Sequence, residues 1–225
     1  MTGDALGAWC QVRAEVDWSS VATAPAPVRP VADGLAAWFD GPVRRRDPDR
    51  ADRLLAAMAL SRAAASRGAP LTPALLDDWQ RLVLGVPDLR LRQGDAFAKG
   101  GRERYGLTPH TWRDFAARLH QSADPSVPLA GRAARAYLDI AFFHPYPDGN
   151  GRLALLALAH ILDVEGVRLD EVGPLQTTRY ADDPAGAADL AALVSALIHA
   201  TRRRATAAAR WRASSGSADR HATNR

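Results

Sequence analysis

Cysteine is almost absent from this chain of 225 residues, which has Cys10 alone. A single cysteine excludes an internal disulfide, and such sparing use fits a reducing compartment such as the cytoplasm. Long apolar runs are missing too, since none reaches the ~20 residues that a helix needs to cross a bilayer. The segment from Met1 to Cys10 has neither a basic region nor a long apolar stretch, so we expect no signal peptide. These absences favour a cytoplasmic protein without a membrane span.

Strand signals are also scarce, whereas helical spacing of apolar residues recurs along the chain. Hydrophobic residues make up 47% and charged residues 24% of the sequence, as is usual for a globular protein with one good core. We therefore predict an all-α fold. Beyond a short N-terminal helix, the predicted helices span residues 48–67, 73–83, 108–121, 129–143, 150–165 and 185–211.

The domain organisation that we predict has three parts. Residues 1–46 are an N-terminal extension, 47–201 the domain core, and 202–225 a basic helix end followed by a disordered tail. The last part holds seven arginines against Asp219 alone, a formal charge of +6, so the net charge of +4 leaves −2 on the rest of the chain. The core is therefore no nucleic-acid binder by charge, and only the basic tail suits RNA, DNA or an acidic partner.

The densest group of reactive side chains lies between two apolar segments. Residues 144–152 read His-Pro-Tyr-Pro-Asp-Gly-Asn-Gly-Arg, after the apolar run 131–143 and before the apolar run 153–164. A connection between two buried helices has no structural need for an imidazole, a carboxylate, an amide and a guanidinium. We interpret this loop as a reaction site.

Several of these residue types suit a phosphate. A helix is predicted to begin at Asn150, and its free N–H groups and positive dipole end attract anions. Gly149 and Gly151 let the backbone approach an anion closely. Arg152 and the amide of Asn150 can donate hydrogen bonds to phosphate oxygens.

The remaining two polar residues suit the chemistry of phosphate transfer. Asp148 is a hard oxygen ligand of the kind that Mg²⁺ takes when it also holds substrate phosphates. His144 titrates near neutrality, so it can take a proton from an attacking hydroxyl. Together the residues of the loop favour metal-assisted attack on a phosphate ester or anhydride.

The stretch 144–152 resembles the signature of Fic proteins, His-x-Phe-x-Asp/Glu-Gly-Asn-Gly-Arg, with Tyr146 in the aromatic position. The resemblance implies a Fic fold, an all-α helical bundle whose active-site loop joins two buried helices beside a short hairpin flap. It also implies a Mg²⁺-dependent protein adenylyltransferase, which moves AMP from the co-substrate ATP to a Ser, Thr or Tyr hydroxyl of a protein target.

The resemblance gives each position of the motif a role. His144 would be the base that deprotonates the target hydroxyl, and Asp148 would hold Mg²⁺ against the α- and β-phosphates. Tyr146 would pack its ring into the core and orient the loop. The phosphates would be bound by a run of four residues, Gly149, Asn150, Gly151 and Arg152.

A polar, glycine-punctuated segment, residues 87–105, precedes the predicted helix at 108. In Fic proteins a hairpin flap lies at this place and positions the target chain by strand pairing. The alternative is a solvated connecting loop. The flap residues that we expect to meet a target are Lys99, Arg102, Arg104 and Tyr105.

The chain departs from the family pattern at Leu155. Many Fic enzymes carry a second arginine there, which binds the terminal phosphate of ATP. Either another arginine replaces it, for which the candidates are Arg90, Arg102, Arg104 and Arg179, or the donor lacks a γ-phosphate. A nucleoside diphosphate, a nucleotide sugar or a CDP-alcohol would be such a donor.

Two further positions bear on activity and its control. None of the four glutamates has Ser or Thr four residues before it, so the family's inhibitory motif is absent and restraint would need a separate antitoxin or an oligomer contact. Doc toxins, which act as kinases, have lysine at the position of Gly151. The glycine of this chain favours nucleotidyl transfer over phosphoryl transfer. Two alternative functions remain. One is a transferase that uses another donor or a small-molecule substrate, and the other is a non-catalytic nucleotide-binding regulatory module.

Overall fold

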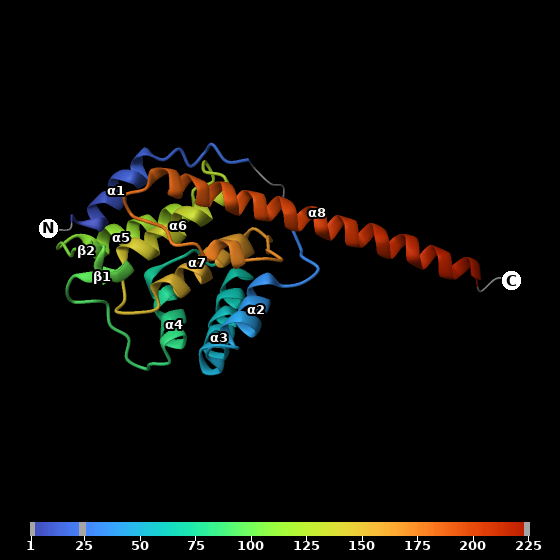
Figure 1. The fold of residues 1–225 in the computed structure, drawn as a ribbon, viewed down its shortest axis with the longest axis horizontal. Helices are drawn as coiled ribbons and strands as arrows, with labels where there is room; N and C mark the ends of the chain where they lie inside the picture. Colours follow the sequence, from blue (N-terminus) through green and yellow to red (C-terminus); the bar gives the residue numbers. More distant parts are fainter. Residues whose placement is uncertain (1–2, 23–25, 223–225) are drawn as a thin grey trace.

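The computed structural model of the chain describes residues 3–22 and 26–222. It is helical apart from one short hairpin, which confirms the predicted all-α class (Figure 1). The helices are α1 (Ala5–Glu15), α2 (Gly34–Trp38), α3 (Pro48–Ala65), α4 (Pro73–Leu84), α5 (Thr111–His120), α6 (Leu129–Phe143), α7 (Asn150–Val164) and α8 (Pro184–Ala222). A π-helical turn, η1 (Phe39–Val43), continues α2, and the strands are β1 (Ala96–Ala98) and β2 (Glu103–Tyr105).

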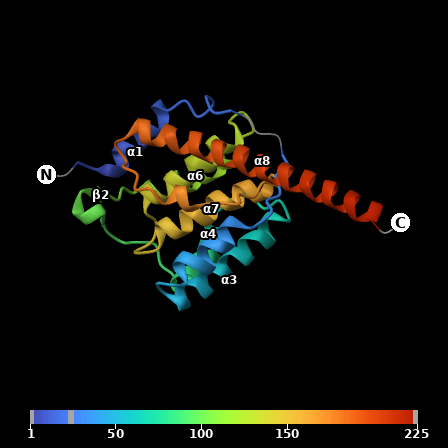
Figure 2. The same cartoon turned by 45° about the vertical axis from the view of Figure 1, so that its right-hand side comes forward.

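Helices α6 and α7 form the centre of the fold. They pack against each other, with α8 along α6 and with α3 and α4 beside α7 (Figures 1 and 2). Both central helices are rich in alanine and leucine, and most of their side chains are buried. The loop 144–149 therefore connects the two most buried helices of the bundle, so its position is held from both sides.

The N-terminal segment packs onto this core. Trp9 is fully buried, and its indole N–H donates to the Oδ1 of Asp139 on α6 at 3.0 Å. The guanidinium of Arg13 also binds Asp139, at 2.7 and 3.0 Å, with both side chains almost completely buried. A buried carboxylate needs such a partner. Helix α1 is thereby fixed to the helix that leads into the loop.

The predicted helix starts were correct where a capping side chain precedes a proline. Asp47 accepts the N–H of Arg50, and Thr72 accepts the N–H of Leu75, with Pro48 and Pro73 in the first turns. The start predicted at Thr108 was wrong, because α5 begins at Thr111. The hydroxyl of Thr111 accepts the N–H of Thr108 at 2.8 Å, which closes a turn before the helix.

Helix α8 is longer than the sequence predicted. It was expected to end near residue 211, with a disordered tail, but the described helix continues to Ala222 and projects beyond the bundle (Figure 1). Residues 223–225 lie outside the described part. By length and composition, Pro184–Ser214 would suffice to cross a membrane, although no apolar run in the sequence suggested it. Core helices pass the same test, and 44% of the apolar window is buried in the fold, so this is weak evidence for a span.

Candidate active site

The loop begins at His144, which ends α6 in a left-handed conformation with φ of 50°. Few residues other than glycine adopt this conformation without support. The support here comes from Arg92, whose side chain donates to the carbonyl oxygens of Phe143 and His144 at 3.2 and 2.9 Å. These are carbonyls of the last turn, which lack helical partners.

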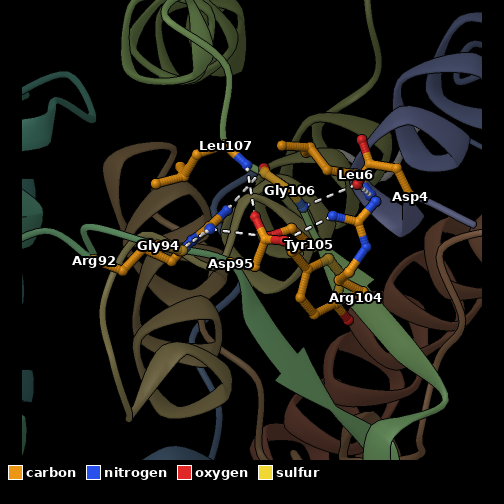
Figure 3. A network of polar contacts seen from close by, with 9 residues as sticks. All are labelled: Asp4, Leu6, Arg92, Gly94, Asp95, Arg104, Tyr105, Gly106 and Leu107. Carbon is orange, nitrogen blue, oxygen red and sulfur yellow. Dashed lines mark hydrogen bonds and ion pairs between the residues drawn. The ribbon is translucent and has the colours of Figure 1, made fainter. Parts of the chain in front are cut away.

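Arg92 also ties the hairpin to the loop. Its guanidinium donates to the backbone oxygens of Gly94, Tyr105 and Gly106, and its backbone N–H donates to Pro145. Figure 3 shows it reaching from the segment before β1 to the end of β2. Burial lowers the pKa of Arg92. In the sequence Arg92 is one of several basic residues in the segment 87–105, and no signal distinguished it from its neighbours.

Asn150 has a different role from the one that its residue type suggested. Its side chain is buried, its Oδ1 accepts the N–H of Tyr146 at 3.0 Å, and its Nδ2 donates to the carbonyl of Tyr146 at 2.7 Å. The amide thus joins the two ends of the turn and does not point at a ligand. Only the backbone of Asn150 remains available at the start of α7.

Tyr146 packs into the core as expected. Its ring is buried, and its hydroxyl donates to Asp77 of α4 at 2.6 Å. Gln80, one turn further along α4, donates to the carbonyl of Asp148 at 2.7 Å. Gln80 is fully buried within the apolar stripe of α4. Sequence reasoning missed it, although a glutamine at an apolar position was a usable signal.

The motif lines a pocket of about 450 Å³ between the start of α7 and the α2–η1–α3 segment. His144, Asp148, Gly149, Gly151 and Arg152 all contribute to its wall, so the structure gathers the sequence-predicted residues in one place. At Gly151 an added Cβ would meet nothing within 4 Å. The pocket thus has open space at the end of a helix whose first N–H groups have no intrahelical partners.

Asp148 and Arg152 face each other across this end of the pocket. An Nη of Arg152 donates to the Oδ2 of Asp148 at 2.7 Å. Burial alone would raise the pKa of Asp148, but the N–H of Gly149 and the Arg152 guanidinium outweigh it and lower this pKa. The carboxylate is therefore ionised at neutral pH, and because the Asp148 side chain is 77% exposed, the pair is weak enough for a ligand to separate.

Magnesium fits this site only together with a phosphate ligand. No group of three or more metal-binding side chains occurs in the part of the chain that the structure describes. Asp148 alone offers an exposed, ionised carboxylate. Mg²⁺ commonly binds to one or two carboxylates, substrate phosphates and water. The donor set suits an ion that arrives with its substrate rather than a resident metal.

His144 has the protonation state that a base requires. Its Nδ1 lies 3.3 Å from the carbonyl of Ala141, which can only accept, so Nδ1 carries the proton and Nε2 is free to take one. Burial lowers the pKa of His144, and the cations of Arg92 and Lys99 oppose its protonation further. The Tyr105 ring stacks on the imidazole, with centroids 5.1 Å apart at 10°.

The hairpin is present, but only part of it faces outward. β1 and β2 pair antiparallel, with Phe97 opposite Arg104, and Phe97 is 62% exposed. Arg102 is exposed and lies over the ring of Tyr180, and Arg104 pairs with Asp95 (Figure 3).

The side chains of Tyr105 and Lys99, which we expected to meet a target, are turned into the fold. Tyr105 is buried, and its hydroxyl donates to the carboxylate of Glu103. Lys99 donates to the same carboxylate, and its side chain is mostly buried. The other oxygen of Glu103 accepts the N–H of Ala181 at 2.8 Å. These residues join the hairpin to the segment before α8, next to His144.

Leu155 is buried and closes one side of the pocket. None of the four arginines that we considered as substitutes lines it: Arg90, Arg102, Arg104 and Arg179 are absent from its wall. The cations that do line it, besides Arg152, are Arg46 and Arg50, which precede and begin α3. Sequence reasoning missed both, because only the tertiary fold brings α3 beside α7.

The comparison with known proteins agrees with this geometry. Residues 70–162, from the segment before α4 to near the end of α7, match the model of the Fic/DOC family. Over this segment the chain is similar to the Fic/DOC family. The match contains the hairpin and the loop of the motif. No curated protein sequence matches the chain.

Solved Fic structures share the fold at low sequence identity. Fic-1 from C. elegans has 16% identity, with 92% of this chain and 72% of that chain covered and a TM-score of 0.53. A Fic domain containing signaling protein from Bacteroides thetaiotaomicron has 14% identity, 69% of each chain covered and a TM-score of 0.50. A variant of IbpAFic2 in complex with adenylylated Cdc42 has 13% identity, 85% and 69% coverage and a TM-score of 0.55. At these identities the likeness shows the Fic fold alone.

Proposed function

We propose that this protein is a cytoplasmic, Mg²⁺-dependent nucleotidyltransferase that moves AMP from ATP to a Ser, Thr or Tyr hydroxyl of a protein. One observation carries the proposal: His144, with Nδ1 against the Ala141 carbonyl, lines the same pocket as Asp148, the N-terminus of α7 and Arg152. A binding module needs the last three but not the base. Intact His144 therefore favours catalysis over the regulatory-module alternative.

The reaction assigns a step to each group. Nε2 of His144 takes the proton of the target hydroxyl, whose oxygen attacks the α-phosphorus of ATP. The bond from that phosphorus to the bridging oxygen breaks, and pyrophosphate leaves with the electron pair. The N–H groups at the start of α7 and Arg152 stabilise charge on the phosphoryl oxygens. Bound Mg²⁺, held by Asp148, would neutralise charge on the departing pyrophosphate.

A protein acceptor is supported by the hairpin and by the relatives. The β1–β2 hairpin carries the exposed Phe97 and packs against the site through Tyr105, whose ring stacks on His144, so a target chain that added to this hairpin would lie near the motif. IbpAFic2 has been solved in complex with adenylylated Cdc42 and covalently tethered to Cdc42. We extend to this chain only the class of acceptor, a protein hydroxyl. Restraint of the activity by a separate antitoxin remains a prediction.

A panel of donors tests this function. ATP, ADP, GTP, UTP and CDP-choline, each with Mg²⁺, are incubated with the wild-type protein and with His144→Ala, and mass shifts of intact proteins are recorded. We expect a gain of one AMP from ATP in the wild type and none in His144→Ala, which should still bind ATP by calorimetry. Equal transfer by His144→Ala would contradict the base assignment.

A second candidate is favoured by Leu155. This apolar side chain lines the pocket where many relatives have an arginine for the terminal phosphate. A transferase that uses a pyrophosphate-linked donor needs no cation at that point. A response to CDP-choline without a response to ATP would establish this alternative and exclude AMP transfer.

A further inference from the structure

The pocket has two cations in its lining besides Arg152. Arg46 follows η1, and Arg50 lies in the first turn of α3. Both line the same pocket as His144, Asp148 and Arg152. Asp148 is the only acid in the lining, against three arginines. The pocket is therefore charged to attract an anion.

The Arg46 guanidinium is available for such an anion. The side chain of Arg46 is exposed, and among the described residues no hydrogen bond or ion pair engages it. Arg50 forms one ion pair, with Asp47 at 3.1 Å, and the side chains of Arg50 and Asp47 are 45% and 32% exposed. Such pairs contribute roughly 0–1 kcal/mol, so a phosphate can replace the carboxylate at little cost.

The geometry of the first turn holds Arg46 and Arg50 in place. The backbone N–H groups of Arg46 and Asp47 both donate to the carbonyl of Val43, at 3.0 and 2.9 Å. Oδ1 of Asp47 then accepts the N–H of Arg50 at 2.9 Å as the cap of α3. The two arginines thus stem from a continuous run of hydrogen-bonded backbone, with Pro42 and Val43 lining the pocket beside them.

The part of the pocket formed by the motif offers hydrogen-bond donors for the inner phosphates of a donor, but none that we can assign to a third phosphate. The open N–H groups at Gly151 and the Arg152 guanidinium lie at the start of α7, and Asp148 is placed for a metal ion. Leu155 follows on α7 and has no polar atom in its side chain. A ligand that stopped at one phosphate would leave Arg46 and Arg50 without an anion.

We infer that Arg46 and Arg50 form the subsite for the terminal phosphates of the donor, which makes a nucleoside triphosphate the preferred ligand. This inference rests on the proposed function, because it names the donor of the same site. It assigns to the α2–η1–α3 segment, which lies outside the family match, the contact that Leu155 cannot make.

Affinities for ATP and AMP, measured by calorimetry with Mg²⁺ on four proteins, test the inference. The proteins are the wild type, Arg46→Ala, Arg50→Ala and the control Arg45→Ala, which removes the same charge from an exposed neighbour that does not line the pocket. A charge-assisted hydrogen bond contributes about 1.5–3 kcal/mol. We expect Arg46→Ala and Arg50→Ala each to weaken ATP binding at least about tenfold and to leave AMP binding within about twofold.

Two results would overturn the inference. One is an equal loss of ATP and AMP affinity in the Arg46 and Arg50 variants, and the other is an effect no larger than that of Arg45→Ala. Circular dichroism of each variant excludes a loss of fold as the cause.

Binding of inorganic tripolyphosphate, measured in the same way, distinguishes failure of this inference from failure of the proposed function. If the wild type transfers no nucleotide but binds tripolyphosphate in a way that Arg46→Ala weakens, the phosphate subsite stands and the proposed transfer fails. If AMP transfer is observed while Arg46→Ala and Arg50→Ala behave like Arg45→Ala, the inference fails alone. If the wild type binds neither ATP nor tripolyphosphate, both fail.

Discussion

The two glycines that flank Asn150 should respond to alanine in opposite ways. Gly149 has φ of +79°, and an added Cβ would lie 2.8 Å from Nε2 of Gln80, the atom that donates to the Asp148 carbonyl. The left-handed conformation costs an L-residue about 1–2 kcal/mol, and the loss of the Gln80 hydrogen bond about 1 kcal/mol more. We expect Gly149→Ala to lower the free energy of unfolding by about 2–3 kcal/mol.

Gly151→Ala should leave the fold intact and impair the site. An added Cβ meets no atom within 4 Å, and the residue lies in the first turn of α7. Alanine in place of glycine favours a helix by up to about 1 kcal/mol, so stability should be unchanged or higher. The methyl group would occupy the space where we place phosphate, so ATP affinity and transfer should fall.

Urea unfolding and ATP calorimetry, performed on both variants and the wild type, decide this pair. The reasoning about the loop would be refuted if Gly149→Ala were as stable as the wild type. The placement of phosphate would be refuted if Gly151→Ala bound ATP with unchanged affinity.

Three further predictions follow from buried contacts. Asn150→Ala leaves two backbone groups of Tyr146 without partners, so urea unfolding should show a loss of about 2–4 kcal/mol, whereas a purely ligand-binding amide would leave stability unchanged. Because burial lowers the pKa of His144 and only its neutral form accepts a proton, kcat/KM should be flat above about pH 7 and fall as the pH drops below about 6.5; a midpoint above pH 7 would contradict this. Asp139→Ala leaves the Arg13 guanidinium buried without its carboxylate, which should cost about 3–5 kcal/mol in the same unfolding assay, and a change under 1 kcal/mol would show that α1 is not part of the core.

The sequence predicted much of the fold, because local chemistry marks most helices. The pairs Asp47-Pro48 and Thr72-Pro73 predict helix starts, because the first residue caps the helix and the proline fixes φ. The apolar runs on either side of the motif predict the bounds of α6 and α7 to within a residue. Helix α2 and the turn η1 were missed. A five-residue helix capped by Asp33 leaves too short a pattern to recognise, and Pro42 reads as a break.

The sequence predicted which motif residues form the site, but not their hydrogen-bond partners or the distant residues that join them. The motif placed His144 and Asp148 at one pocket, because nine consecutive residues cannot separate far. The roles of Asn150 and Arg92 depend on burial and on partners distant in the sequence, which residue type does not reveal. Arg46 lies about a hundred residues before the motif, so only the packing of α3 against α7 brings it to the pocket.

The most direct test of the account is to follow the label from ATP. The wild-type protein and His144→Ala are incubated with Mg²⁺ and ATP labelled at either the α- or the γ-phosphorus, with the protein itself and a cell lysate as acceptors, and the labelling seen with lysate alone is subtracted. The account predicts that only the α-label becomes bound to protein, in a linkage to a hydroxyl side chain, and that His144→Ala abolishes the transfer. Transfer of the γ-label, or undiminished transfer by His144→Ala, would contradict it.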